Sequence, residues 1–469
     1  MPDLSLLFDT AAARALDGRA SALAGDGGWS LMAQAGLAGW QCLLQQWPEA
    51  LQLCVLAGAG NNGGDGYVLA SHALRSGRQV QVVTLPGTVP ATALAAQAAA
   101  EFAAAGGCIV AFDGQLPAAE IYVDALFGLG LDRAPAGMAQ SLIEALSAAQ
   151  RPVLAMDVPS GVDADSGCVP GVAVKATVTL QFIACHRGLY TGDALEQVGQ
   201  RRLAPLELPD QAWDGIHASA QRWTGDRLPV LLPPRRANTH KGESGHVLCI
   251  GGNHGSGGAV VMAAEAALRA GAGLLSVGTR RDHVGPLLAR LPEAMAHALE
   301  DSDALPALLD RAGVVAIGPG LGQDEWARAL FARVLACDKP LVVDADALNL
   351  LAAEPSLAER VRRRAGPTVL TPHPLEAARL AGCDVARIQS DRLACARALA
   401  RHFGATIVLK GSGSVIDDGT HTWINTTGNA GLATGARARG GASAPSAAGS
   451  PGSLDAALRT SPAVPWSCP

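Results

Sequence analysis

Apolar runs recur along the chain, and each is followed by a glycine-containing turn and then by an alanine-rich stretch. Runs that are apolar on both faces are typical of buried parallel strands, and the stretches between them have the period of helices. One such helix is predicted over 66–76, ended by Gly77. In the first half of the chain the predicted strands are 52–57, 79–85, 121–127 and 153–158. The alternation predicts right-handed βαβ units in a doubly wound α/β sheet.

The alternation breaks between about 203 and 236, where PLELPD and RLPVLLPP contain prolines that disfavour both helices and inner strands. A second series of predicted strands follows, at 246–250, 274–277, 314–317, 341–344, 368–370 and 406–409. We therefore predict one α/β domain over 1–215 and a second over 225–435. Residues 436–469 lack hydrophobic periodicity, and we expect them to form a low-complexity tail.

Composition narrows the class of protein. The 469 residues are 49% hydrophobic and 17% charged, which is typical of globular domains. The net charge of -6 and the lack of a long basic run favour neither nucleic acid nor a membrane as partner. The amino end carries Asp3 and no basic segment, unlike a signal peptide. Ten scattered cysteines without a CxxC pair fit a reducing compartment, so we predict a cytoplasmic protein.

The sharpest motif is AGAGNNGGDGYVLA at 57–70, where a predicted strand runs into a glycine-rich loop before a helix. Such a loop lets backbone N–H groups converge on an anion at the helix N-terminus. A bare glycine-rich turn is more often structural. Three short polar side chains, Asn61, Asn62 and Asp65, favour a site instead, because they can ligate a cation or a ribose. The spacing is not that of an ordinary dehydrogenase fingerprint.

Two more polar loops follow predicted strands. VDALFGLGLDRAP places Asp124 at a strand end, and MDVPSGVDADSG places Asp157 at another, followed by Ser160 and Asp163. Each Asp could simply cap the next helix. Because the carboxyl ends of parallel strands share one edge of a sheet, three such loops together favour a ligand site there.

These three motifs together resemble the N-terminal, Rossmann-like YjeF-type domain of NAD(P)H-hydrate epimerases, over roughly 10–210. The resemblance implies interconversion of the R and S hydrates at C6 of the nicotinamide ring, and a potassium ion. The implied metal ligands are Asn61, Asn62, Asp124 and Ser160. The implied substrate contacts are Asn62, Gly63, Gly64, Asp65, Gly66, Gly128, Leu129, Gly130, Leu131, Asp132, Arg133, Ala134 and Asp157.

The candidate acid/base of this reaction is Asp157, with Asp163 second; spacing alone assigns neither. One stretch departs from the family. In FIACHRGLYTG this chain has Cys185, His186 and Arg187 where the family usually has Lys-x-Gly-Leu. A lone histidine in such a place is expected to be structural.

The second half contains IGPGLG, VVDADALN, LTPHPLEAARL and VLKGSGSVI, each after a predicted strand. Singly these are weak signals, but their order resembles the ADP-dependent NAD(P)H-hydrate dehydratase domain, which has a ribokinase-like fold. The resemblance implies substrate contacts at Ala259, Gly322 and His373, although a core histidine is the plainer interpretation of the last. It implies nucleotide contacts at Lys410, Gly411, Ser412, Gly413 and Ser414. ADP would phosphorylate the C6 hydroxyl with magnesium offsetting the charge, and loss of phosphate would restore NAD(P)H.

Ribokinase-like domains end this site with Gly-x-Gly-Asp, whose glycines form an anion hole and whose Asp acts as base. Here NTTGNAGLATG agrees with the family through Gly435, but Arg439 stands where the register places the Asp. The pattern is lost beyond that point. We therefore expect an incomplete dehydratase domain, cut short by a frameshift near codon 435, with weak or absent dehydratase activity.

The sequence thus predicts a repair enzyme for NADHX and NADPHX, a homo-oligomer with no nucleic-acid or membrane partner. Two alternatives remain. One is a ribokinase-like small-molecule kinase fused to a nucleotide-binding domain, which would need the missing Gly-Asp even more. The other is a non-enzymatic binding scaffold, against which the polar residues of the first half argue.

Overall fold

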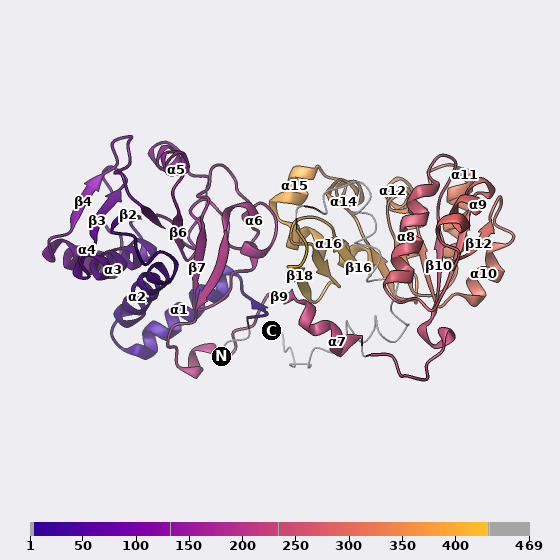
Figure 1. Ribbon diagram of the computed structural model, residues 1–469, viewed down its shortest axis with the longest axis horizontal. Coiled ribbons are helices and arrows are strands. Elements are labelled where there is room, and N and C mark those ends of the chain that lie inside the picture. Colours follow the sequence, from indigo (N-terminus) through magenta and orange to yellow (C-terminus); the bar gives the residue numbers. More distant parts are fainter. Residues whose placement is uncertain (1–3, 132, 233, 430, 432–469) are drawn as a thin grey trace. The chain divides into compact units, whose positions relative to one another are not determined.

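The chain folds as two compact units, the first ending at Arg222 and the second beginning at Trp223. The computed structural model describes residues 4–131, 133–232, 234–429 and 431, and Figure 1 labels its helices and strands. The tail predicted over 436–469 lies outside the described residues. Within the described parts of the chain, every helix is too short or too polar to cross a membrane.

Unit 1 is built on a parallel sheet in which the chain order reverses between β2 and β5. In spatial order its strands are β4 (Cys108–Ala111), β3 (Gln79–Thr84), β2 (Gln52–Ala57), β5 (Ile121–Ala125), β6 (Val153–Met156), β7 (Val178–Phe182) and β8 (Gln200–Ala204). A short antiparallel pair joins β1 (Leu6–Leu7) to β9 (Ala220–Trp223). The reversal between β2 and β5 is the place where such sheets bind ligands, because the two following helices depart to opposite faces there.

Helices cover both faces of this sheet, as the doubly wound pattern predicts. Alternate residues of β2 enter different cores: Leu53 and Val55 pack on one face, Cys54 and Leu56 on the other. The first face is covered by α1 (Thr10–Ala24), α2 (Trp29–Gln46), α3 (Asn61–Arg75) and α4 (Ala93–Ala104), and the second by α5 (Met138–Ala148) (Figure 1). A strand buried on both sides explains why 52–57 is apolar at nearly every position.

Helix α3 begins at Asn61, five residues before the predicted start, so the prediction of a long glycine-rich loop was wrong. Its glycines lie inside the helix because the helix packs extremely closely. A Cβ on Gly63 would lie 2.0 Å from the carbonyl oxygen of Gly58, and one on Gly66 would lie 2.7 Å from the Cβ of Ala125. Close packing thus outweighs the low helix propensity of glycine.

Unit 2 has a longer sheet whose strands run in the order β12 (Met295–Ala298), β11 (Leu274–Thr279), β10 (His246–Ile250), β13 (Val314–Ile317), β14 (Leu341–Val343), β15 (Thr368–Leu370), β16 (Thr406–Leu409), β17 (Val415–Asp417) and β18 (Thr422–Asn425). The strands from β12 to β16 are parallel, and β17 and β18 are antiparallel. Here the chain order reverses between β10 and β13.

Its longer helices follow the strands of the parallel part. They are α8 (Gly257–Arg269), α9 (Arg281–Arg290), α10 (Leu305–Arg311), α11 (Glu325–Val334), α12 (Asp346–Ala353), α13 (Pro355–Arg362), α14 (Pro374–Ala381), α15 (Val385–Ser390) and α16 (Arg392–Phe403). One core lies between α8 and the sheet, and includes Val247, Cys249, Val260 and Ala264. The segment 203–236, predicted as a linker, contains the strand β9 and a short helix α7 (Leu228–Leu231).

Candidate active sites

The loop after β6 is tied to the end of β5 by a buried carboxylate. Asp124, on β5, is fully buried and accepts hydrogen bonds from the hydroxyl of Ser160 at 2.6 Å and from its backbone N–H at 2.8 Å. The backbone N–H of Leu126 donates to the same carboxylate at 3.2 Å. Burial raises the pKa of Asp124 to about 6 despite these donors. The cost of removing the carboxylate from water therefore exceeds the stabilisation that three hydrogen bonds give its charge. A bound cation could stabilise that charge further.

Asn62, in the first turn of α3, completes this cluster. Its Nδ2 donates to the carbonyl of Phe127 at 3.0 Å, and the N–H of Phe127 donates to the Ser160 hydroxyl at 2.8 Å. The Oδ1 of Asn62 is buried and has no hydrogen-bond partner among the described residues. Asn61 lies apart, since it is exposed and its Oδ1 accepts from the Thr92 hydroxyl at 2.7 Å. The structure therefore brings together three of the four predicted metal ligands.

Asp157 follows β6 and is held in a strained conformation. Its φ of 65° lies in the left-handed region, which costs a non-glycine residue about 1–3 kcal/mol and is enriched at functional sites. Its Oδ1 lies 2.7 Å from Nε2 of His186, and the N–H of Phe182 donates to the same oxygen at 3.4 Å. The carboxylate keeps 13% of its surface exposed, so it is the member of the pair that a ligand could reach.

Asp163, the second acid/base candidate, organises its own loop. Its Oδ1 accepts from the N–H groups of Asp165 and Ser166, at 3.0 and 2.7 Å, and from the Ser166 hydroxyl at 2.8 Å. These three donors fix the carboxylate within its own loop. This geometry favours a structural role for Asp163 and leaves Asp157 as the better placed of the two.

A cavity of about 220 Å³ opens beside this loop. It is lined by Thr10, Arg14, Gly128, Leu129, Gly130, Leu131, Asp163, Ala164 and Asp165. Four of the predicted substrate contacts, residues 128–131, thus line one cavity. Arg14 holds this segment in place by donating a hydrogen bond to the carbonyl oxygen of Leu129 at 2.7 Å. Arg133 and Ala134 are exposed, and Asp132 lies outside the described residues. The volume is below the range of complete ligand pockets, so this cavity suits one end of an extended ligand.

Asp65 adds a second unusual carboxylate on α3. Burial raises its pKa well above the usual range, and the charges of Asp157 and Asp17 raise it further. Asp65 and Asp157 therefore lie near enough for their charges to interact.

In unit 2 the predicted residues Lys410 and His373 share a network of charges. The Lys410 ammonium lies 2.7 Å from the carboxylate of Asp344 and 3.8 Å from that of Glu376. Nε2 of His373 lies 3.3 Å from Glu376, and its Nδ1 accepts from the backbone N–H of Leu375 at 3.1 Å. His373 is thus the N-cap of α14, and burial lowers its pKa. It is a half-exposed cap and not the core histidine of the plainer interpretation.

The loop 410–414, predicted to hold a nucleotide, is shaped by an arginine beneath it. Gly411 has a φ of 142° and Gly413 a φ of 62°, both left-handed conformations that favour glycine. The fully buried Arg392 donates to the carbonyl oxygens of Leu409 and Lys410 at 3.2 and 3.1 Å, and a Cβ on Gly411 would lie 2.8 Å from its guanidinium. The backbone path of this loop therefore depends on the buried arginine.

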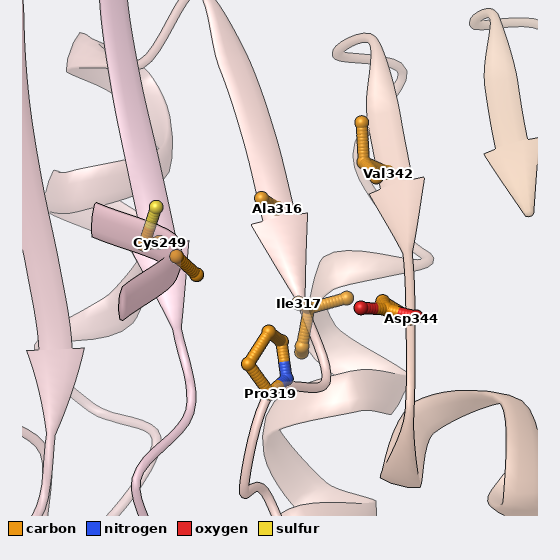
Figure 2. Close-up of a pocket in the computed structure, with 7 residues that line it drawn as sticks. Cys249, Ala316, Ile317, Pro319, Val342 and Asp344 are labelled. Carbon is orange, nitrogen blue, oxygen red and sulfur yellow. The ribbon is translucent and has the colours of Figure 1, made fainter. Parts of the chain in front are cut away.

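The other predicted substrate contacts of unit 2 lie at the β10–β13 reversal. Ala259, on α8, is buried, and the N–H of Gly322 donates to the carboxylate of Asp346 at 2.9 Å. Behind them lies a cavity of about 10 Å³, lined by Cys249, Ala263, Ala316, Ile317, Pro319, Val342 and Asp344. Figure 2 shows Asp344 at the end of β14, directed toward Ile317. This cavity holds at most one water molecule, so ligand binding belongs to the loops outside it.

Comparison with known proteins places this geometry in a family. The pattern that defines NAD(P)H-hydrate dehydratases matches residues 247–437, and the pattern of the YjeF-related protein N-terminus matches 29–188. A bifunctional NAD(P)H-hydrate repair enzyme of Escherichia coli is 43% identical over 87% of this chain and 78% of its own length. The Coxiella burnetii enzyme of the same name is 42% identical over 92% of this chain and 87% of its own.

This chain belongs to the bifunctional NAD(P)H-hydrate repair enzymes. Its membership confirms the predicted family and enzyme class, with a YjeF-type domain followed by a dehydratase domain. Together with the two sheets, it confirms the predicted α/β fold class. Among solved structures, the ADP/ATP-dependent NAD(P)H-hydrate dehydratase of Bacillus subtilis is 31% identical over 50% of this chain and 83% of that one, with a TM-score of 0.42.

Sequence reasoning assigned no chemical role to several residues that this repair enzyme brings into its sites. Asp344 and Glu376 lie within the motifs VVDADALN and LTPHPLEAARL. Acidic residues in motifs that follow predicted strands could have been named as candidate site residues from the sequence. His186 lies where this chain departs from the family's Lys-x-Gly-Leu, and the sequence predicted only a structural role for it. Arg392 had no signal, because nothing local distinguishes a buried arginine from an exposed one.

Proposed function

We propose that unit 1 of this repair enzyme epimerises the hydrates of NADH and NADPH at C6, with Asp157 as the acid/base. The observation that carries the proposal is the placement of Asp157: a partly exposed carboxylate, held in a strained conformation at the end of β6, beside the β2–β5 reversal. Asp163 remains the second candidate, weakened by the three donors on its Oδ1.

Two routes can exchange the face of C6. In ring opening, Asp157 accepts the proton of the C6 hydroxyl while the C6–N1 bond breaks and N1 is protonated; closure on the other face of the carbonyl reverses both transfers. In the second route the C6 hydroxyl is lost: the protonated carboxyl group of Asp157 gives its proton to the departing oxygen as the C6–O bond breaks. Water then adds to the other face and returns a proton to Asp157. Either route needs one group that both takes and returns a proton.

Substrate binding would use the loops that meet at the reversal. The first turn of α3, residues 61–66, presents backbone N–H groups and the positive end of the helix dipole, which suits the pyrophosphate. The cavity lined by 128–131 would receive one end of the dinucleotide. Glycines 63, 64 and 66 act mainly by allowing the close packing that fixes this turn.

Potassium fits the cluster formed by Asn62, Asp124 and Ser160. Hard cations take oxygen ligands, and the cluster offers a carboxylate, a hydroxyl and the buried Oδ1 of Asn62, which has no hydrogen-bond partner in the described part of the chain. A cation there would also offset the unfavourable burial of the Asp124 charge. Asn61 is the least suited of the four predicted ligands, since its oxygen faces Thr92.

For unit 2 we propose the ADP-dependent dehydration of the S hydrate, at a reduced rate. Phosphoryl transfer from ADP to the C6 oxygen gives AMP and a phosphate ester; loss of phosphate from C6 and of a proton from C5 then restores NAD(P)H. Lys410 would contact phosphate after leaving Asp344, and magnesium would neutralise the transferring group. The reduced rate follows from Arg439, which stands at the place of the base, although that residue lies outside the described ones.

The test is an assay on purified hydrates. The wild-type protein should epimerise the R form, and Asp157→Ala should lower kcat by about 100-fold or more. Asp163→Asn keeps the Oδ1 acceptor and is the matched control, expected to stay within a fewfold of wild type. Absence of epimerisation by the wild type would favour the scaffold alternative. Dehydration of the S form with ADP at a rate typical of intact relatives would refute the proposed loss in unit 2.

A further inference from the structure

His186 lies beside Asp157 in a position that leaves its ring no freedom. The side chain is 1% exposed. Its backbone N–H donates to the side-chain oxygen of Gln181 at 2.8 Å. On either side of His186, the N–H of Phe8 donates to the carbonyl oxygen of Cys185 at 2.8 Å, and the N–H of Arg187 donates to the carbonyl oxygen of Phe8 at 2.9 Å. The loop that holds the ring is therefore fixed at three points, independently of Asp157.

The two ring nitrogens of His186 have unlike surroundings. Nε2 lies 2.7 Å from Oδ1 of Asp157, whereas Nδ1 is buried and has no partner among the described residues. Nε2 is therefore the ring nitrogen that is placed to donate a hydrogen bond to the carboxylate.

We propose that His186 is a positioning residue of the epimerase site: its imidazole donates a hydrogen bond from Nε2 to Asp157, and so aims that carboxylate and fills one of its lone pairs. The proposal rests on the proposed role of Asp157. It replaces the expectation that this histidine is merely structural. In this chain a histidine thus stands where the family usually has a lysine.

The surroundings of the pair agree with this role. The strained backbone of Asp157 cannot by itself fix its side chain, and the only other donor to its Oδ1 among the described residues is the N–H of Phe182 at a long 3.4 Å. Asp17 on α1 and Asp65 on α3 are the acidic groups that interact with Asp157. The neighbouring cation, Arg187, is turned away: it donates to the carbonyl of Asp165 and lies 3.9 Å from Asp9. Among the described residues, His186 is thus the closest donor to the proposed base.

Three substitutions test the proposal in the full-length protein. His186→Leu removes the donor and should lower kcat for epimerisation by about 100-fold with little change in KM, because the base is no longer aimed. His186→Gln offers a neutral N–H at a similar reach and should recover at least tenfold of that loss. His186→Lys should restore activity and move the acidic limb of the kcat profile to lower pH by about one unit, because an ammonium favours the ionised carboxylate.

The control is Cys185→Ala, a buried neighbour outside the site, which should stay within about threefold of wild type. In an Asp157→Ala background, His186→Leu should have no further effect, since a positioning residue acts through its partner. A folded Leu variant with wild-type kcat, or equal losses in both backgrounds, would overturn the proposal. If the Leu variant does not fold, the Lys variant decides: an unmoved acidic limb overturns the proposal. An inactive wild type would instead refute the epimerase function itself.

Discussion

The first turn of α3 depends on Gly58, and Gly58→Ala should disrupt the candidate epimerase site. A Cβ at this position would lie 1.8 Å from the carbonyl oxygen of Leu126. Because a Cβ atom essentially never lies within 3.0 Å of a non-bonded heavy atom, the end of β5 would have to move by roughly 1 Å, at the 1–3 kcal/mol typical of overpacking.

The shift would also strain the bonds that hold the cluster together. The Leu126 N–H donates to Asp124, and the two backbone groups of Phe127 bond to Ser160 and Asn62. Each such bond contributes about 1 kcal/mol, so loss of two brings the expected destabilisation to about 3–5 kcal/mol. Gly60→Ala is the matched control, since its Cβ would meet nothing within 4 Å and its φ is an ordinary -85°. It should cost no more than about 1 kcal/mol as a changed N-cap.

Hydrogen exchange is the suitable assay, because unfolding of a two-unit chain is not a single transition. Peptides covering β2, β5 and the first turns of α3 should lose about 100-fold or more of their protection in Gly58→Ala, since 1.4 kcal/mol corresponds to a factor of ten. Protection in Gly60→Ala should change by less than tenfold. Equal protection in the two variants would show that the loop adapts to the extra atom, and would refute the reasoning.

Three further predictions concern single side chains. Asn62→Ala should raise the potassium concentration for half-maximal epimerase activity by about tenfold. The measurement is a KCl titration in which choline chloride keeps the ionic strength constant. An unchanged curve would show that Asn62 is not a potassium ligand. Asp65→Asn should stabilise unit 1 at neutral pH: the raised pKa of Asp65 means that folding takes up a proton above the ordinary value of 3.8, so the contribution of Asp65 to stability falls as pH rises, and the gain should vanish in acid. A gain independent of pH would contradict this. Lys410→Met should destabilise unit 2 by about 3 kcal/mol because it removes the ammonium that lies 2.7 Å from the buried carboxylate of Asp344. The double variant with Asp344→Asn should recover most of this loss, as measured by hydrogen exchange over β14 and β16.

The local patterns found most of the strands but not all the boundaries. Strand β10 coincides with the predicted 246–250 because it is apolar on both faces. Strand β7, VTLQF, was missed because it contains the polar residues Thr179 and Gln181, which are nevertheless buried. Their polar atoms find partners elsewhere in the fold: the Thr179 hydroxyl donates to the carbonyl of Val198 at 2.7 Å. Such partners come from distant residues, so no local pattern indicates them.

The candidate sites divide in the same way. The order of the motifs was enough to predict the family, the two domains' chemistry and the loops at the strand ends, because residue identity and spacing are local properties. The tertiary structure decided which side chains meet. It joined Asn62 to Asp124 and Ser160 through Phe127, turned Asn61 toward Thr92, and placed His186 against Asp157. It also placed the glycines of NNGGDG within a helix. The reason is close packing against atoms such as the Gly58 carbonyl oxygen and the Ala125 Cβ, which meet these glycines only in the folded chain.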